Sequence, residues 1–460
     1  MVVKQNINPG SRDHRFLDGR ILVVGLGASG LSCARFLAGQ GAEIAVTDSR
    51  PQPPGLDVLQ RELPDVAVFV GGFEPEAFRR ADCLVVSPGV SLREPLVSEA
   101  RARGAAILGD IEIFARFAEA PVVAITGSNG KSTVTTLLAQ MAQESGIETA
   151  VGGNIGIPAL DLLDAKPELY VLELSSFQLE TTSSLDAVAA AILNISEDHM
   201  DRYDGLSDYT AAKTRIYYGS GALVVNRDDP AVMATLAKVD RGRTVVQFGL
   251  GEPGENDFGL CRHEAGTWLC RGEKALMPET ALRVKGRHNS ANALAALALG
   301  EAIGLPMDAM LAVLQRFPGL PHRCQWVRER QDVSWFNDSK ATNVGAAAAA
   351  LEGIPAEKLV LIAGGQGKGQ DFAPLRDVVS RRCRAVVLLG EDAGQLMQAL
   401  ADTVPLHEVD DLPQAVERAA GLARAGDAVI LSPACASFDM FNGFEARGEA
   451  FVQAVEALPE

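Results

Sequence analysis

The sequence predicts an α/β protein of three domains, built from parallel sheets that helices cover. The chain has 460 residues, enough for about three domains of ordinary size. Its hydrophobic content of 47%, with 45 Gly and 23 Pro, is typical of a globular α/β protein. In addition, short apolar segments repeatedly run into Gly-rich or polar turns that precede helix-like segments, which is the pattern of strand, turn and helix.

Charge and hydropathy exclude several classes of function. A formal net charge of −17 would repel nucleic acid and anionic membranes. No apolar run reaches the roughly 18 residues that a membrane span needs. The segment Met1 to Arg20 is polar and lacks the apolar stretch of a secretory signal. We therefore expect a cytoplasmic protein that binds neither nucleic acid nor membrane. We also expect a monomer, although charge and hydropathy do not indicate the oligomeric state.

The cysteines predict no covalent framework. Their number is odd, they are scattered along the chain, and no pair has the Cys-x-x-Cys spacing. This argues against both a disulfide framework and a zinc site. We expect reduced thiols in the cores for all seven, at positions 33, 83, 261, 270, 324, 383 and 435.

The first segment has the βαβ pattern of a nucleotide-binding Rossmann unit. The apolar strand Ile21 to Val24 runs into the Gly-x-Gly-x-x-Gly turn from Gly25 to Gly30, a helix-like run and the strand Ile44 to Asp48. Asp48 lies near the position where a carboxylate would hold a ribose, so NAD and a UDP-sugar are both admissible ligands. A later strand ends in the loop Ser87 to Gly89, which is either a second ligand loop or an ordinary turn.

The stretch from Pro121 to Val134 predicts a phosphate-binding loop. Pro121 to Ile125 is typical of a buried strand, and Gly127 and Gly130 allow the backbone N–H groups to approach an anion. Lys131 would add a point charge, and the hydroxyl of Ser132 or Thr133 could bind Mg²⁺. Compared with a full P-loop the motif is shortened, because Ile125 stands where the first glycine is expected. We expect this loop to bind ATP. The alternative is a Gly-rich turn that binds no ligand.

Polar groups follow the next strands of this segment. Glu173 directly follows an apolar strand, where a nucleoside triphosphatase holds its Mg²⁺. His199 is either a functional group or a hydrogen-bonded structural histidine, and Lys213 is either functional or a solvated helix residue. Asn289 and Asn292 would share a helix face and could bind a base or ribose, although Asn289 could instead cap the helix.

Two boundaries divide the chain into residues 1–110, 111–320 and 321–460. The Pro/Gly-rich link from Pro318 to Arg323 closes the second domain. Four apolar strands with polar loops at their carboxyl ends then predict a second doubly wound sheet. Neither Cys435 nor Ser437 has a nearby His in the sequence, so binding is favoured over covalent catalysis there.

These signatures together resemble the Mur ligases over nearly the whole chain. They are Gly127 to Thr133, Glu173 to Glu180, Asn194 to Tyr203, Ala212-Lys213, Arg287 to Asn289, Asn337 to Asn343 and Leu431 to Arg447. The unit Gly25 to Gly30 and the ending Ser432 to Gly448 resemble the member that adds D-glutamate to UDP-N-acetylmuramoyl-L-alanine. One departure lies between His199 and Lys213, where Tyr203-Asp-Gly205 stands in place of a Pro-containing version that is one residue longer.

The resemblance implies ADP-forming amide synthesis in cytoplasmic peptidoglycan synthesis, with ATP and Mg²⁺. The L-alanyl carboxylate would form an acyl phosphate, which the amine of D-glutamate attacks. The resemblance also implies three Rossmann-like or P-loop domains, which bind the UDP-sugar, ATP and glutamate in chain order.

Residue by residue, the resemblance assigns three binding sites and a metal site. The UDP-sugar site would comprise Ala28, Ser29, Asp48, Ser49, Arg50, Gly89 and Asn154. ATP would contact Gly127, Ser128, Asn129, Gly130, Lys131, Ser132, Thr133, Asn289, Asn292, Arg323 and Asp338. Glutamate would contact Thr342, Lys368, Ser437 and Phe444. One Mg²⁺ would be bound by Ser132 and Glu173. A second would be bound by His199 and by Lys213, the latter as a carbamate. The catalytic residues would be Lys131, His199 and Lys213.

Other functions remain open on the sequence. Another Mur-type ligase or a folylpolyglutamate synthetase-like ligase would share the second and third domains, but the first domain argues against the latter. A nicotinamide-dependent oxidoreductase would use Gly25 to Gly30 and leave the Lys131 loop without a purpose. A non-catalytic nucleotide sensor would not need the full set of metal and phosphate ligands.

Overall fold

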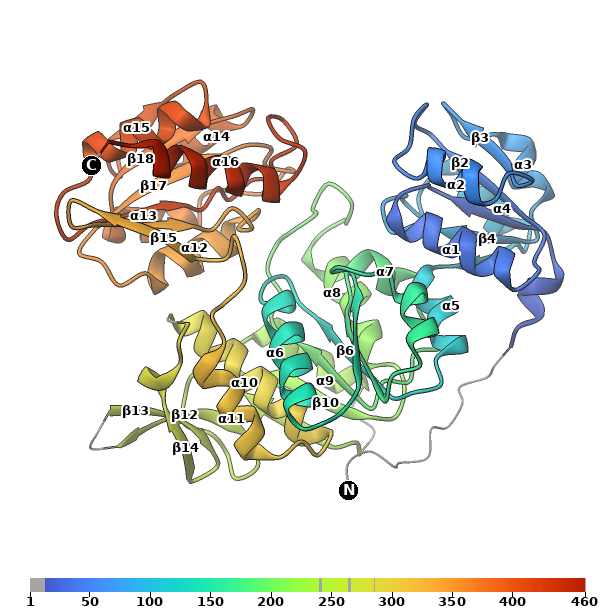
Figure 1. Ribbon diagram of the computed structural model, residues 1–460, viewed down its shortest axis with the longest axis horizontal. Coiled ribbons are helices and arrows are strands. Elements are labelled where there is room, and N and C mark those ends of the chain that lie inside the picture. The colour runs from blue at the N-terminus through green and yellow to red at the C-terminus, as the bar shows by residue number, and fades with distance from the viewer. Residues whose placement is uncertain (1–12, 240–241, 264–265, 285, 460) are drawn as a thin grey trace.

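A computed structural model describes residues 13–239, 242–263, 266–284 and 286–459. It contains three separate sheets, one in each of three successive parts of the chain, and the predicted three-domain α/β class is confirmed. Figure 1 shows the N-terminal domain in blue, the middle domain in teal to yellow and the C-terminal domain in orange to red. Residues 1–12, which carry much of the segment predicted to lack a secretory signal, lie outside the described residues.

The N-terminal domain is a five-stranded parallel sheet with the strand order β3-β2-β1-β4-β5. All four residues of the central strand β1 are buried, as its apolar sequence predicts. Gly30 permits α1 to pack closely, because a Cβ there would lie 1.9 Å from the carbonyl oxygen of Gly25. The elements are β1 (Ile21–Val24), α1 (Ala28–Gly39), β2 (Ile44–Asp48), α2 (Leu56–Glu62), β3 (Ala67–Val70), α3 (Pro75–Arg80), β4 (Cys83–Val86), α4 (Pro95–Ala102) and β5 (Ala106–Leu108), after the short 3₁₀ helix Arg15–Asp18.

The middle domain follows α5 (Asp110–Phe117) and contains a nine-stranded sheet of order β14-β13-β12-β11-β10-β9-β6-β8-β7. Its strands are β6 (Val122–Thr126), β7 (Thr149–Gly153), β8 (Leu169–Glu173), β9 (Ala189–Ile192), β10 (Ala222–Asn226), β11 (Val245–Phe248), β12 (Phe258–His263), β13 (Gly266–Arg271) and β14 (Lys274–Pro278). Its helices are α6 (Lys131–Glu144), α7 (Ser176–Glu180), α8 (Leu206–Thr214), α9 (Pro230–Val239), α10 (Arg287–Ala302) and α11 (Met307–Arg316), with 3₁₀ helices at Ala159–Ala165, Arg215–Tyr217 and Glu279–Ala281. Strand β6 lies between β8 and β9, and all three are parallel, so their polar carboxyl ends meet at one edge.

The expectation that every cysteine is a reduced thiol in a core is wrong for one pair. Cys261 and Cys270 form a disulfide, with their Cα atoms 6.2 Å apart. The antiparallel pairing of β12 with β13 brings residues nine positions apart into neighbouring places on adjacent strands. Because strand pairing decides this proximity, the irregular spacing of the cysteines in the sequence could not show it. The other five are free: Cys33, Cys83, Cys383 and Cys435 are buried, and Cys324 is partly exposed.

The C-terminal domain has a six-stranded sheet of order β15-β16-β20-β17-β18-β19. The four predicted strands form its parallel centre, and two edge strands, β15 and β19, complete it; β15 is antiparallel to β16. The strands are β15 (Gln325–Arg330), β16 (Val333–Asn337), β17 (Leu359–Gly364), β18 (Cys383–Leu389), β19 (Leu406–Glu408) and β20 (Ala428–Leu431). The helices are α12 (Val344–Gly353), α13 (Leu375–Arg382), α14 (Ala393–Ala399), α15 (Leu412–Leu422) and α16 (Phe444–Ala457).

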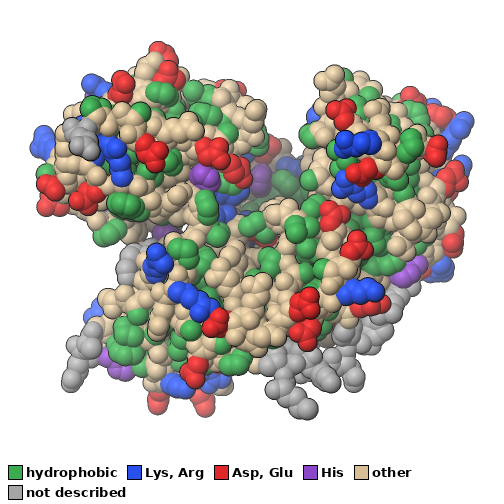
Figure 2. Space-filling view, in the orientation of Figure 1, with side chains coloured by type: hydrophobic (Ala, Val, Ile, Leu, Met, Phe, Trp, Pro, Cys, Tyr) green, Lys and Arg blue, Asp and Glu red, His purple; other side chains and the backbone are tan. Residues whose placement is uncertain are grey.

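The middle domain lies between the other two, and Figure 2 shows the surface hollowed where the two outer domains face each other. The middle and C-terminal domains are joined by hydrogen bonds, such as those between the side chains of Asn129 and Asn343. Among the helices of the described ranges, none combines the length and apolar character that crossing a bilayer requires.

Candidate active site

The loop between β6 and α6 is the predicted phosphate-binding loop, and it lies at the carboxyl end of β6 in the middle sheet. Gly130 precedes α6 with φ of 84°, and a Cβ there would lie 2.4 Å from Oδ1 of Asn292. A side chain at this position would therefore be strained and would clash with α10. Lys131 begins α6, and its Nζ donates to the carbonyl oxygens of Gly127 at 2.8 Å and Ser128 at 2.9 Å. Burial lowers the pKa of Lys131.

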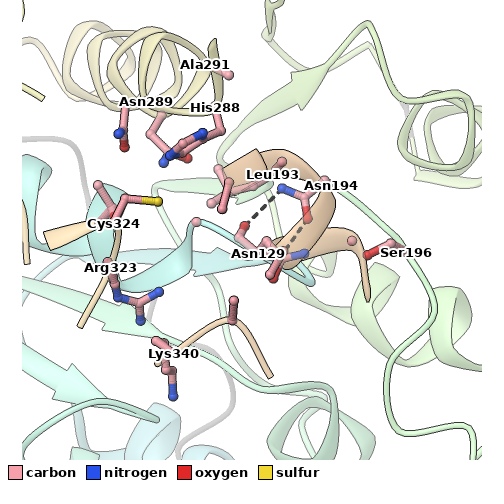
Figure 3. A pocket seen from close by; sticks show the side chains of 18 of the residues that line it. Asn129, Leu193, Asn194, Ser196, His288, Asn289, Ala291, Arg323, Cys324 and Lys340 are labelled. Carbon is pink, nitrogen blue, oxygen red and sulfur yellow. Dashed lines mark hydrogen bonds between the residues drawn. The ribbon is translucent and has the colours of Figure 1, made fainter. Parts of the chain in front are cut away.

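A cavity of about 340 Å³ adjoins this loop. Its lining includes most residues predicted to contact ATP: Asn129, Gly130, Thr133, Asn289, Asn292, Arg323 and Asp338. Figure 3 shows Asn129 hydrogen-bonded to Asn194 on one side of the cavity. Arg323 and Cys324, which are neighbours in the chain, lie on the opposite side. Nη2 of Arg323 donates to Oγ of Ser132 at 2.6 Å, which connects the segment preceding β15 to the first turn of α6. Residues that are far apart in the chain thus form one pocket beside the loop.

Asp338 lies buried in this cavity's wall, directly after β16. Its Oδ1 accepts from the backbone N–H of Cys324 at 3.0 Å, and its Oδ2 accepts from Oγ of Ser432 at 2.8 Å. Burial raises the pKa of Asp338 to about 6, although these hydrogen bonds act in the opposite direction. Asp338 is therefore a carboxyl group that titrates close to neutral pH.

A second cavity of about 330 Å³ shares Asn129, Gly130, Arg323 and Lys340 with the first. It collects the predicted metal ligands and the predicted glutamate-binding residues: Ser132, Glu173, His199, Lys213, Thr342, Lys368, Ser437 and Phe444. Ser128, Lys131 and Asn154 also line it. The two cavities are therefore adjoining parts of one site between the middle and C-terminal domains.

Glu173 offers an unused carboxylate oxygen to this second cavity. The residue ends β8 and is buried; its Oε1 accepts from Nδ2 of Asn154 at 2.7 Å. Its Oε2 is buried and has no hydrogen-bond partner among the described residues. Leaving such a group unsatisfied costs about 1–3 kcal/mol, and more when the group is charged. An oxygen in this state fits the predicted role of Glu173 as a ligand of Mg²⁺.

Lys213 is a buried amine with few partners. It lies on α8 and is only 1% exposed, and its Nζ donates to the carbonyl oxygen of Gly127 at 2.9 Å. The ammonium position also lies 4.6 Å from the ring centroid of Tyr209. Burial, and after it the positive charge of Lys131, lowers the pKa of Lys213 well below its ordinary value. Both effects favour the neutral amine over the ammonium, relative to a lysine in solvent.

His199 and Asp198 occupy the loop after β9. Burial lowers the pKa of His199 to about 4, although its Nε2 lies 3.7 Å from Oδ2 of Asp198. Burial alone would raise the pKa of Asp198, but His199 and Lys368 nearby lower it to about 2. His199 is therefore neutral at pH 7, which leaves a ring nitrogen able to bind a metal. The ring also packs against Phe177, with the centroids 4.7 Å apart.

Most residues predicted for the UDP-sugar lie apart from these cavities, at the carboxyl edge of the N-terminal sheet. Ala28 and Ser29 begin α1, Asp48 ends β2, Ser49 and Arg50 follow it, and Gly89 follows β4. Asn154 alone among them lines the second cavity. Asp48 accepts from the backbone N–H of Leu26 at 2.7 Å and from Arg50, so this carboxylate holds the Gly-rich turn. Its contact with a ribose stays a prediction.

Sequence reasoning assigned no role to Lys340, which lines both cavities. Its Nζ lies 3.9 Å from the ring centroid of Phe444, and burial, with Arg323 and Lys131 nearby, lowers its pKa to about 8. Figure 3 shows its side chain beside Arg323. Its place in the polar loop after β16 is a signal that could have identified it, because open α/β sheets bind ligands there.

Three family models match the chain in succession. The Mur ligase MurD-like, N-terminal domain matches residues 19–109, the Mur ligase middle domain residues 125–300, and the Mur ligase, glutamate ligase domain residues 322–435. The chain belongs to the Mur ligase family. The expected family and the expected enzyme class, a ligase, are thereby confirmed.

Curated relatives in the Mur ligase family match almost end to end. The UDP-N-acetylmuramoylalanine--D-glutamate ligase of Nitrosococcus oceani is 56% identical over 439 residues, which covers 95% of this chain and 96% of that protein. The protein of the same name from Pseudomonas aeruginosa is 56% identical over 442 residues, covering 95% and 98%.

Solved structures of Mur ligases and related proteins have the same fold. MurC of Thermotoga maritima, a UDP-N-acetylmuramate-alanine ligase, matches with a TM-score of 0.59 and 18% identity, over 95% of this chain and 99% of that one. The E. coli FolC complex with DHPP and ADP matches with a TM-score of 0.55 and 19% identity, over 73% and 89%. At such identities the likeness concerns the fold alone.

Proposed function

We propose that this Mur ligase joins D-glutamate to the L-alanyl carboxyl group of UDP-N-acetylmuramoyl-L-alanine, at the expense of ATP, in peptidoglycan precursor synthesis. The choice of substrates is supported by the relatives named UDP-N-acetylmuramoylalanine--D-glutamate ligase. The observation that supports the proposal best is the second cavity. In it, the loop after β6, the carboxylate oxygen of Glu173 without a partner among the described residues and the buried amine of Lys213 face residues of the C-terminal domain.

In this proposal, the L-alanyl carboxylate attacks the γ-phosphorus of ATP, and ADP leaves. The amine of D-glutamate then attacks the carbonyl carbon of the acyl phosphate, phosphate leaves, and the amine loses its proton. Lys131, with the N–H groups from Gly127 to Thr133, would neutralise charge on the transferred phosphoryl group. Arg323, which already contacts Ser132, and Lys340 would add positive charge from the C-terminal side.

The residues present fit two Mg²⁺ ions. Glu173 and Ser132 would hold one, and His199 with Lys213 would hold the other. An ammonium cannot bind a cation, since it has no lone pair. In its neutral form, which burial favours, the amine of Lys213 could instead take up CO₂ and become a carbamate, whose oxygens suit Mg²⁺. When bound, the metal ions would neutralise phosphate charge during transfer.

The remaining residues would position the other substrates. Asn289, Asn292 and Asp338 would hold the base and ribose of ATP in the first cavity. Thr342, Lys368, Ser437 and Phe444 would hold D-glutamate. Ala28, Ser29, Asp48, Ser49, Arg50, Gly89 and Asn154 would hold the UDP-sugar. The proposal includes domains at 1–110, 111–320 and 321–460, and a cytoplasmic monomer without a membrane or nucleic-acid partner.

One coupled assay tests the proposal. Phosphate release from ATP is measured with UDP-N-acetylmuramoyl-L-alanine plus either D- or L-glutamate. Release that requires both the UDP-sugar and D-glutamate is the expected result. Equal release with L-glutamate, or release with a folate in place of the UDP-sugar, would contradict the substrate assignment.

A further inference from the structure

A second cluster of metal-binding side chains lies on the β12–β13 hairpin, outside the active site. Cys261, His263 and Cys270 each place a ligand atom within 4.8 Å of the other two. Among the described residues, this is the one cluster of three or more Cys, His, Asp or Glu side chains with such geometry. None of the three lines either cavity of the active site. The cluster therefore needs an explanation of its own.

Strand pairing puts the three side chains on one face of the hairpin. Cys261 pairs with Trp268, His263 pairs with Gly266, and Cys270 pairs with Gly259. Because side chains alternate along a strand, positions 259, 261 and 263 share a face with their partners on β13. The Sγ of Cys261 lies 3.6 Å from Nε2 of His263. The antiparallel register therefore places all three side chains on the same face of the hairpin.

The cluster runs from the core to the solvent. Cys270 is fully buried, Cys261 is partly exposed and His263 is exposed. Opposite His263, Gly266 carries no side chain, and a Cβ built there would have no described atom within 4 Å. Because His263 is exposed, a solute can reach the triad from the side of this residue. The net charge of −17 would also attract cations to the protein.

We propose that, once the disulfide is reduced, Cys261, Cys270 and His263 bind one Zn²⁺-like cation, with a water molecule as the fourth ligand. Two thiolates and one imidazole are a zinc ligand set, and sulfur ligands select soft or borderline metals over Mg²⁺. In a tetrahedral zinc site the ligand atoms lie roughly 3.3–3.8 Å apart. The ligand atoms of this cluster, which all lie within 4.8 Å of one another, need only small shifts to reach that spacing.

The two states of the cluster exclude each other. Reduction breaks the S–S bond and yields two thiols. An added phosphine supplies the two electrons and takes the oxygen of a water molecule, and the two protons of that water go to the sulfurs. Metal binding then releases the two thiol protons to the solvent. In either state β12 and β13 are cross-linked, and the Arg271–Glu301 ion pair connects β13 to α10, which carries Asn289 and Asn292. The metal would thus replace the disulfide as the cross-link under reducing conditions.

Cobalt titration of the full-length protein tests this site. Metal-free protein is reduced with a phosphine and titrated with Co²⁺, whose thiolate charge-transfer absorption reports sulfur ligation and whose visible bands report tetrahedral geometry. One Co²⁺ per chain with both signals, displaced by Zn²⁺, is expected. Untreated protein, with the disulfide intact, should show no thiolate band. The predicted Mg²⁺ ligands include no thiol, so they cannot produce that band.

Variants identify the ligands. Cys261→Ser/Cys270→Ser should abolish the thiolate band, whereas Cys383→Ser, a buried free thiol elsewhere, should leave it unchanged. His263→Ala removes only an exposed side chain and should keep the fold, but it should weaken binding at least about tenfold. A thiolate band that persists in the double variant would overturn the proposal. So would its absence from reduced wild type, or His263→Ala binding as tightly as wild type.

Discussion

The Nζ of Lys368 lies 2.7 Å from Oδ1 of Asp198, although the two residues are 170 positions apart. Lys368 follows β17 in the C-terminal domain, and Asp198 follows β9 in the middle domain. Both side chains are largely buried in the second cavity. This ion pair joins the loop that carries His199 to the predicted glutamate site. It also means that a substrate carboxylate would have to compete with Asp198 for Lys368.

Lys368→Ala should raise the KM for D-glutamate about 10- to 150-fold, because a hydrogen bond to a charged group contributes roughly 1.5–3 kcal/mol. The KM for ATP should change much less. Steady-state phosphate release at varied D-glutamate measures both constants. Lys358→Ala is the matched control, since that partly exposed lysine lies outside both cavities and its Nζ donates to the carbonyl oxygen of Arg381. An unchanged KM for D-glutamate would remove Lys368 from the glutamate site.

Lys131→Ala should lower kcat at least about 100-fold while the protein stays folded, by analogy with the loss of one preorganised oxyanion donor. Turnover and the circular dichroism spectrum are measured together. Lys274→Ala, at an exposed position on β14, serves as the control for removing a lysine. Turnover near that of the wild type would refute the assignment of Lys131 to the triphosphate.

Lys213→Ala should be nearly inactive, and acetate should partly restore turnover if the missing group is an anionic carbamate. The neutral amine that burial favours is the form that reacts with CO₂. Acetate should not restore Lys131→Ala, whose missing group is a cation. Rescue of Lys213→Ala by an alkylamine and not by acetate would show instead that Lys213 acts as an ammonium.

Nucleotide affinity should fall as the pH drops through about 6, the pKa to which burial raises Asp338. Above this pH the ionised carboxylate can accept hydrogen bonds from ribose hydroxyls, and below it the carboxyl group is protonated. If binding requires the ionised form, affinity should change up to about tenfold per pH unit below 6. Calorimetric titration with ADP between pH 5 and 8 measures this.

Asp338→Asn provides the control for that titration, because the amide does not ionise. Its affinity should be lower at pH 8 and should vary less between pH 5 and 7. Parallel pH profiles for the two proteins would assign the titration to another group in the cavity, such as His288, whose pKa burial lowers.

Local features of the chain were predictable because their chemistry is contained in a few neighbouring residues. The loop from Gly127 to Thr133 combines the strand, the glycines, the lysine and the start of α6 within one short segment. Glu173 could be identified in the same way, since the end of an apolar strand defines where its side chain emerges. The central parallel strands, such as β1, β6 and β17, were readable from their apolar runs.

Contacts between distant segments were not predictable from motifs alone. The edge strands β15 and β19 were missed, because neither has a distinctive apolar run. The place of Lys340 in both cavities was also missed, although the residue lies in a polar loop at the end of a strand. The disulfide was predicted to be absent, because the register of β12 against β13 is not visible in cysteine spacing. The domain boundaries and the roles of individual site residues stay predictions.

The fold class, the family and the places of the predicted phosphate loop and of the carboxylate at the end of β8 could all be derived from the sequence alone. These depend on hydrophobic periodicity and on short motifs, which act over a few residues. The pairing of Lys368 with Asp198, the contact of Arg323 with Ser132 and the lowered pKa of the buried Lys213 depend instead on the tertiary structure. The physical reason is that charge pairing and desolvation depend on which surfaces the packed domains bring together, and that information is distributed over the whole chain.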